Sequence, residues 1–330
     1  MAYHYATEAC ANTADMFAKI NTFLVTTVGW TLHDDQSGAA TPYRVYRSPG
    51  EASVGFRYLQ VLLVSTTFVN FRMYRFWDAD THTGTYQVGQ TSTTQGILGA
   101  TSEFVVFFMG DLDNFFVVIK ISDVYRIAGM AKLTTLYADG TAVTTDAVSS
   151  GSDVVIPVDD DSFFEEGFYE IANTNSATGA TEIVEVTNVG VGEITVATLA
   201  NNHPAGAIIS KQAIPFALFN HTTNADVVFT FRINDTAGTT AVSGTSAAPA
   251  TAVLSPDAIE AKFQLWPGWV YYPTDNMVYG HPSVIFKIST TDLSSEDLIT
   301  VNGTEYIVFN ATRSPFSTAG RTAIKKGSVA

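Results

Sequence analysis

The sequence predicts an all-β protein with a single short helix near its N-terminus. Its 330 residues include 22 Phe and 14 Tyr, and Thr, Val and Ile are abundant. Aromatic and β-branched side chains favour the half-buried, pleated surface of a sheet. Several segments alternate between apolar and polar residues, and short Gly, Asn and Asp clusters separate them. A chain of this length can build two or three modest cores.

The predicted helix covers residues 13–27. Its apolar residues follow the rhythm of one helical face, which indicates an amphipathic helix. Asn12 or Thr13 can cap the N-terminus, Asp15 suits the first turn, and Gly29 stands where a C-terminal cap is needed. The rest of the chain is predicted to form strands.

Strands are predicted on both sides of the middle of the chain. Residues 69–77 alternate most clearly and are read as one strand. Residues 103–109 and 115–121 are apolar runs joined by a five-residue linker, which is typical of a β-hairpin. Further short strands are predicted around residues 229–233, 284–289 and 305–309, the last after an Asn302-Gly303 turn.

The middle of the chain has a pattern of its own. Five short strands with frequent turns and no Trp predict a small β-barrel at 150–214: 153–158, 167–172, 182–189, 193–197 and 207–210. The flanks, 1–135 and 216–330, hold all four Trp residues and are expected to form one aromatic-rich β-sandwich. The barrel would then be inserted in a surface loop, where insertions are well tolerated.

Charge and composition exclude several classes of protein. The formal net charge of −15 disfavours binding to nucleic acid, because the surface repels phosphate. The longest apolar region, residues 104–121, is interrupted at 110–114, so no membrane span is predicted. Cys10 is the single cysteine and allows no internal disulfide. The N-terminus lacks the pattern of a secretory signal, so we expect folding in a cytoplasm.

No catalytic, cofactor or metal motif stands out. The six His residues have no zinc spacing, and we expect each to lie at the surface or in a turn. The segment His33-Asp34-Asp35 could bind a cation, although a polar turn is the preferred interpretation. Residues 78–89 only partly match a calcium loop, because Thr83 and Gly89 replace the required Gly and Glu.

The densest acidic cluster is Asp159-Asp160-Asp161 with Glu165 and Glu166. Sugar hydrolysis needs two carboxylates that face each other across a cleft, which adjacent turn residues do not provide. A solvated turn is the preferred interpretation and a weak calcium site the alternative. We therefore predict that the protein is not an enzyme and has no cofactor.

An aromatic motif contains Trp266, Trp269, Tyr271 and Tyr272. Flat apolar rings could stack on a sugar as a glycan platform, but a Pro-Gly turn with two Trp side chains can equally close the end of a sandwich core. We favour the core interpretation.

Two parts of the chain resemble proteins of tailed-bacteriophage particles. The opening helix, the segments 28–35 and 43–50, and the aromatic strand ending at 76–84 resemble the start of virion proteins encoded among phage structural genes. Residues 164–168, 180–186 and 202–207 are similar to a small β module that recurs in phage virion proteins. The resemblance covers about half of the chain, implies a particle protein without enzymatic activity, and transfers no active-site residue.

The resemblance implies a virion protein made in the host cytoplasm, most simply in the neck, collar, tail or baseplate. Capsid decoration and glycan binding on the virion surface are the alternatives. Expected partners are other virion proteins and further copies of the chain. The Ala-, Thr-, Ser- and Gly-rich segment 236–255 is too poor in large apolar residues to form a core, so we interpret it as an intersubunit arm that would bury Val242, Val253 and Leu254.

Overall fold

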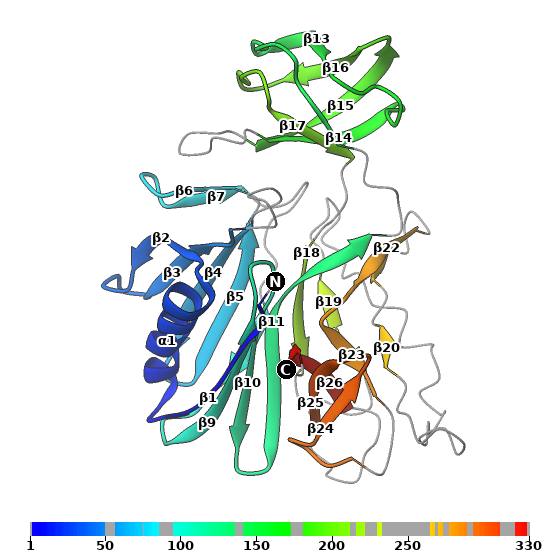
Figure 1. Cartoon of the computed structure of the whole chain (residues 1–330). Coiled ribbons are helices and arrows are strands. Elements are labelled where there is room, and N and C mark those ends of the chain that lie inside the picture. The colour runs from blue at the N-terminus through cyan, green and yellow to red at the C-terminus, as the bar shows by residue number, and fades with distance from the viewer. Residues whose placement is uncertain are drawn as a thin grey trace, which may run out of the picture. The chain divides into compact units, whose positions relative to one another are not determined.

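The computed structural model confirms the predicted all-β class (Figure 1). It describes residues 2–49, 57–74, 76–85, 95–135, 141–172, 181–211, 216–221, 230–232, 265–267, 270–272, 277–288, 293–310 and 321–328. The chain divides into two compact units. The first combines Met1–Thr134 with Pro215–Ala330, and the second is Thr135–Ile214.

The N-terminal helix is present where the sequence predicts it, in two parts. The α-helix α1, Thr13–Asn21, continues as a π-helix, η1, Thr22–Val28. The Asn12 side chain caps α1 by accepting a hydrogen bond from the amide of Asp15 at 3.0 Å. Gly29 ends η1 with a φ of 91°, a left-handed conformation that glycine adopts without steric cost.

The largest sheet of the first unit has eight strands, and we call it the large sheet. Six follow one another in the order β1 (His4–Cys10), β9 (Phe104–Gly110), β10 (Phe115–Ile121), β11 (Val124–Thr135), β18 (Phe216–His221) and β19 (Thr230–Arg232). The other two are β22 (Met277–Pro282), which pairs with β11, and β21 (Val270–Tyr272), which pairs with β22. β9 and β10 pair antiparallel, which confirms the predicted hairpin.

A second sheet, which we call the helix-side sheet, follows the helix in the sequence. Its strand order is β2 (Thr31–Gln36), β3 (Tyr43–Arg47), β4 (Tyr58–Ser65), β5 (Phe68–Tyr74) and β8 (Gln95–Leu98). Residues 69–74 and 76–77 lie in strands as predicted, but they pair in two different sheets. The ladder of β5 ends at Tyr74, and β6 (Phe76–Asp78) turns away to pair with β7 (Thr83–Thr85) as a separate hairpin.

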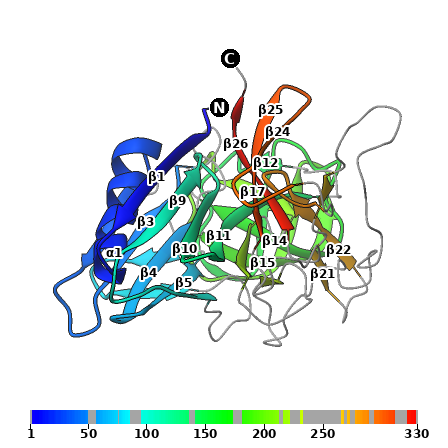
Figure 2. The ribbon, with the colours of Figure 1, turned by 90° about the horizontal axis from the view of Figure 1, so that it is seen from below.

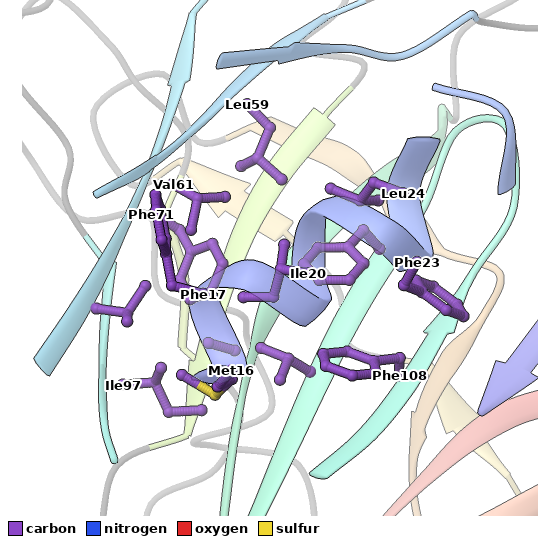
Figure 3. Packing of buried hydrophobic residues seen from close by; sticks show 14 of the residues in the cluster. Met16, Phe17, Ile20, Phe23, Leu24, Leu59, Val61, Phe71, Ile97 and Phe108 are labelled. Atoms are coloured by element: carbon purple, nitrogen blue, oxygen red, sulfur yellow. The ribbon is translucent and has the colours of Figure 1, made fainter. Parts of the chain in front are cut away.

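The helix joins these two sheets through one apolar core. Figure 3 shows Met16, Phe17, Ile20, Phe23 and Leu24 of the helix among side chains of both sheets. The helix-side sheet contributes residues such as Phe71, and the large sheet contributes Phe108, whose ring stacks on Phe23 with centroids 5.4 Å apart. Burial of this many apolar side chains is the main stabilising term of the unit.

A third sheet, the C-terminal sheet, has the order β20 (Trp266–Pro267), β23 (Ile285–Lys287), β26 (Arg321–Ser328), β25 (Thr304–Asn310) and β24 (Leu298–Val301). Phe309 packs edge-on against Phe107 of the large sheet, with centroids 5.1 Å apart. Phe107 and Phe108 are adjacent in β9 and therefore point to opposite faces. The large sheet thus packs on both faces in a sandwich-like arrangement, and β1 also approaches β26 (Figure 2).

The second unit is a six-stranded antiparallel sheet. Its order is β12 (Thr141–Val143), β17 (Ile208–Lys211), β14 (Gly167–Ala172), β15 (Thr181–Gly190), β16 (Glu193–Leu199) and β13 (Gly151–Pro157). The strands β13 to β17 overlap the five strands predicted from the sequence, whereas β12 was not predicted. An isolated bridge between Thr144 and Val158 links the two outer strands just beyond their ends. The predicted barrel itself stays a prediction. In the described part of the chain, no helix has the length and apolarity to cross a bilayer.

Candidate functional site

One buried polar site of the first unit is centred on the carboxylate of Asp34 in β2. The Asp34 side chain is only 3% exposed. Its Oδ2 accepts hydrogen bonds from Trp77 Nε1 at 2.8 Å and from His82 Nδ1 at 2.9 Å, and its Oδ1 accepts one from Gln36 Nε2 at 3.0 Å. We call Asp34, Gln36, Trp77 and His82 the Asp34 cluster. Three donors compensate for the removal of this charge from water.

The Asp34 cluster forms because β2 carries a bulge. The register with β3 shifts between Leu32 and Asp34, so that His33 has no partner of its own in the ladder. His33 instead uses Nε2 to donate to the carbonyl of Trp77 at 3.1 Å. The β6–β7 hairpin is therefore held to β2 by side chains rather than by a strand ladder.

His82 occupies the turn of this hairpin in a left-handed conformation, with a φ of 56°. Backbone strain of this kind persists where surrounding contacts hold it. Asp34 holds the Nδ1 side of the ring, while the His82 side chain is 45% exposed. Gly84 in β7 makes the close approach possible, because a Cβ there would lie 2.3 Å from Tyr74 Cδ1.

The electrostatics of Asp34 follow from these contacts. Burial raises the pKa of the Asp34 carboxyl, but the hydrogen bonds from His82, Gln36 and Trp77 outweigh burial, so the pKa lies below its ordinary value. Asp34 is therefore charged at neutral pH. A carboxylate-oriented imidazole can accept a proton or bind a metal. However, among the residues described, no three His, Cys, Asp or Glu side chains gather in a way that could hold a metal ion. The arrangement acts as a clasp for the hairpin.

The sequence interpretation of residues 33–35 as a polar turn is wrong, because all three lie in β2. The cluster could not be found from spacing, since Asp34 and His82 are 48 positions apart. The partial calcium motif is also part of this hairpin: Asp78 Oδ1 accepts hydrogen bonds from the amides of Asp80 and Thr81 and so shapes the turn.

A second buried acid–histidine pair stabilises the second unit. Glu182 Oε1 lies 2.7 Å from His203 Nε2, and the His203 side chain is fully buried. The other Glu182 oxygen accepts a hydrogen bond from the amide of Ala200 at 2.7 Å. Burial raises the pKa of Glu182. The hydrogen bonds from His203 and from the amides of Ala200 and Asn201 lower it by more, so the net shift of the pKa is downward. The expectation of an exposed or turn histidine is wrong for His203, which is buried and forms an isolated bridge with Val148.

The carboxylates of the acidic cluster at 159–161 bind backbone amides. Asp159 accepts from Val143 at 2.7 Å, Asp160 from Ser162 at 2.9 Å, and Asp161 from Gly192 at 2.6 Å. Their side chains are thus occupied in fixing turns. This geometry agrees with the preferred interpretation of a turn over that of a calcium site or an acid–base pair.

The aromatic motif is divided between sheets. Trp266 lies in β20 of the C-terminal sheet, whereas Tyr271 and Tyr272 lie in β21, which pairs with β22. Trp269 lies outside the described residues. The segment 236–255, with Val242, Val253 and Leu254, also lies outside them. Both the glycan platform and the intersubunit arm therefore stay predictions.

Exposed apolar side chains occur at sheet edges. Among the described residues, five large apolar side chains are exposed, and three of them lie on outer strands of three different sheets: Leu98 of β8, Val155 of β13 and Leu298 of β24. Their exposed fractions are 42%, 46% and 48%. Outer strands also present unpaired backbone groups, so an apolar side chain at an edge favours association with another strand.

No family model matches the chain, and no curated protein matches it.

Proposed function

We propose that the chain is a non-enzymatic structural component of a tailed-phage particle, most simply in the neck, collar, tail or baseplate. It works by self-association and by contacts with other virion proteins. The resemblance of residues 28–84 and 164–207 to virion proteins supports the origin. The single structural observation that carries the mode of action is the exposure of an apolar side chain, Leu298, on the outer strand β24 of the C-terminal sheet.

The charged sites support a structural role as well. Asp34 and Glu182 are buried carboxylates, and each is tied to a histidine and to further donors that shape a hairpin or a loop. The acids at 159–161 hold turns. Carboxylates engaged in this way stabilise the fold by fixing a hairpin, a loop and several turns.

Localisation on purified particles tests the proposal. An antibody raised against the chain, used for immunogold electron microscopy together with mass spectrometry of the particles, should find the protein at the neck or tail. Labelling over the head would favour capsid decoration instead. If mass spectrometry finds no copy of the chain in washed particles, the structural proposal is wrong.

Glycan binding has a separate test. A glycan array with the purified chain, compared with the Trp266→Ala and Trp269→Ala variants, would detect a platform. We expect no signal that depends on either tryptophan.

A further inference from the structure

The outer strands of the described sheets differ in how they are protected against pairing with other chains. Natural proteins block such edges with bulges, inward-facing charges, proline, very short strands or covering side chains. β2 carries both a bulge and the buried charge of Asp34. In β8, the guanidinium of Arg126 donates to the carbonyl of Leu98 at 2.7 Å. Both edges of the helix-side sheet are thus partly blocked.

The outer strands of the large sheet are blocked in similar ways. In β1, the carbonyl of Ala9 accepts a hydrogen bond from Lys19 Nζ. The ring of Tyr5, also in β1, is covered by the side chain of Lys326 from β26. β19 is only three residues long, and β21 pairs irregularly with β22 between Val270 and Tyr271. In the second unit, Asp153 interrupts β13 with a φ of 51°. These features match known edge protection.

In the C-terminal sheet, one outer strand, β20, contains Pro267, whereas the other, β24, is short but has no bulge, charge or proline. β24 reads Leu-Ile-Thr-Val, without charge or proline. Its four residues pair with β25 in unbroken register, from Leu298 opposite Ile307 to Val301 opposite Thr304. In the described part of the chain, β25 is the only strand that pairs with β24.

The turn that follows β24 shows which backbone groups face outward. Asn302 and Gly303 have φ values of 50° and 75°, as in a two-residue type I′ hairpin. In such a hairpin the flanking residues, Val301 and Thr304, form a hydrogen-bonded pair, and the pattern alternates along the strand. The N–H and C=O groups of Leu298 and Thr300 therefore point away from β25. Both side chains are exposed.

We propose that the free edge of β24 pairs with β24 of a second copy of this chain, antiparallel across a two-fold axis. The C-terminal sheets of the two copies then form one continuous sheet. A two-fold contact brings the same strand from each copy together, so no second complementary surface is needed. This inference rests on the proposed function and specifies which surface of the protein self-associates.

Local charge favours a second copy over a basic partner. The net charge of −15 makes most surfaces of two copies repel each other. At β24, however, Glu296 is bonded by Lys120 at 2.5 Å and by Tyr125 at 2.6 Å, and Glu305 opposite β24 pairs with Lys326 at 2.8 Å. Asp297 accepts a hydrogen bond from the amide of Ser294. Two of these three acids are thus paired with lysines, so this edge carries much less negative charge than the chain as a whole and can meet its own copy.

The contact is expected to be weak in solution. Four residues a side bury much less than the roughly 1,200 Å² of a stable, specific interface. A weak contact becomes effective when several copies are held close together, as in a particle. Association should accordingly depend on concentration.

Sedimentation velocity of the full chain over a wide concentration range tests this contact. We expect the wild type to shift from monomer toward dimer as concentration rises. Leu298→Lys adds a charge at the edge, and Thr300→Pro removes an outward-facing N–H without breaking the ladder to β25; both should keep the chain monomeric. Leu98→Lys is the matched control on the blocked edge of β8, and it should dimerise like the wild type.

Hydrogen exchange of the wild type provides a test that needs no variant. The amides of Leu298 and Thr300 should exchange more slowly at high than at low concentration. If they exchange equally at concentrations where dimer forms, if Leu298→Lys dimerises normally, or if the wild type stays monomeric throughout, the β24 contact is wrong. A chain that is monomeric in solution but present in particles contradicts this contact alone and leaves the proposed function standing.

Discussion

At the scale of single residues, buried acids organise the irregular parts of this fold. Asp34 and Glu182 lie far from their histidine partners in sequence, and each binds several donors at once. A buried charge is costly unless its hydrogen-bonding capacity is filled. Each of these sites should therefore be sensitive to the loss of a single carboxylate oxygen.

Asp34→Asn should destabilise the protein by about 2–3 kcal/mol. The amide that replaces Oδ1 or Oδ2 cannot accept a hydrogen bond, so a buried donor from Trp77, His82 or Gln36 loses its partner. Chemical denaturation of both proteins measures the change. Asp35→Asn is the control, because Asp35 is more exposed and its pair with Arg44 lies at the surface, where loss costs at most about 1 kcal/mol. Equal effects of the two substitutions would contradict the clasp.

Glu182 should make stability depend on pH. Its pKa is lowered in the folded state, so its contribution is complete above the ordinary Glu value of 4.5 and is lost as pH falls through the lower folded value. Unfolding free energies measured from pH 6 down to pH 3 should therefore fall more steeply for the wild type than for Glu182→Gln. Parallel curves would show that the His203 and amide bonds do not stabilise the charged form.

At the scale of elements, close contact between β10 and β11 depends on one glycine. A Cβ at Gly129 would lie 2.2 Å from the carbonyl oxygen of Phe115 and 2.9 Å from Cα of Phe116. Both are backbone atoms in the centre of the large sheet, so the clash cannot be relieved by rotating a side chain. Packing on both faces of this sheet leaves little room for adjustment.

Gly129→Ala should therefore lower the free energy of unfolding by at least about 2 kcal/mol. Gly38→Ala is the control, since a Cβ at Gly38 meets no atom within 4 Å. Thermal melting of the two variants beside the wild type compares them. A melting temperature of Gly129→Ala equal to that of Gly38→Ala would mean that the strands can separate without cost.

At the scale of the whole molecule, the chain forms two compact units, and the second is one continuous stretch, Thr135–Ile214. Its sheet includes β12 (Thr141–Val143), which lies before residues 150–214, the segment that the sequence predicts as a barrel. β12 pairs with β17, and the amide of Thr145 donates to the carbonyl of Pro157 at 3.0 Å, so residues 141–145 tie the two outer strands together.

A fragment of residues 135–214 should fold alone, whereas a fragment of 150–214 should be clearly less stable. The shorter piece lacks β12, the Thr144–Val158 bridge and the Asp159 bond to the amide of Val143. Dispersed amide NMR spectra and cooperative melting distinguish the two. Absence of both signals for the longer fragment would show that the second unit depends on the rest of the chain.

Local patterns in the sequence predict the short-range elements of this protein. The helix, its caps at Asn12 and Gly29, the β9–β10 hairpin and five strands of the second unit follow from periodicity and turn chemistry, which act over a few residues. The division of 69–77 between two sheets, the addition of β12, the Asp34 and Glu182 sites and the exposure of β24 become visible only in the folded structure. These depend on residues tens of positions apart meeting in space, and one sequence contains no local signal for such contacts.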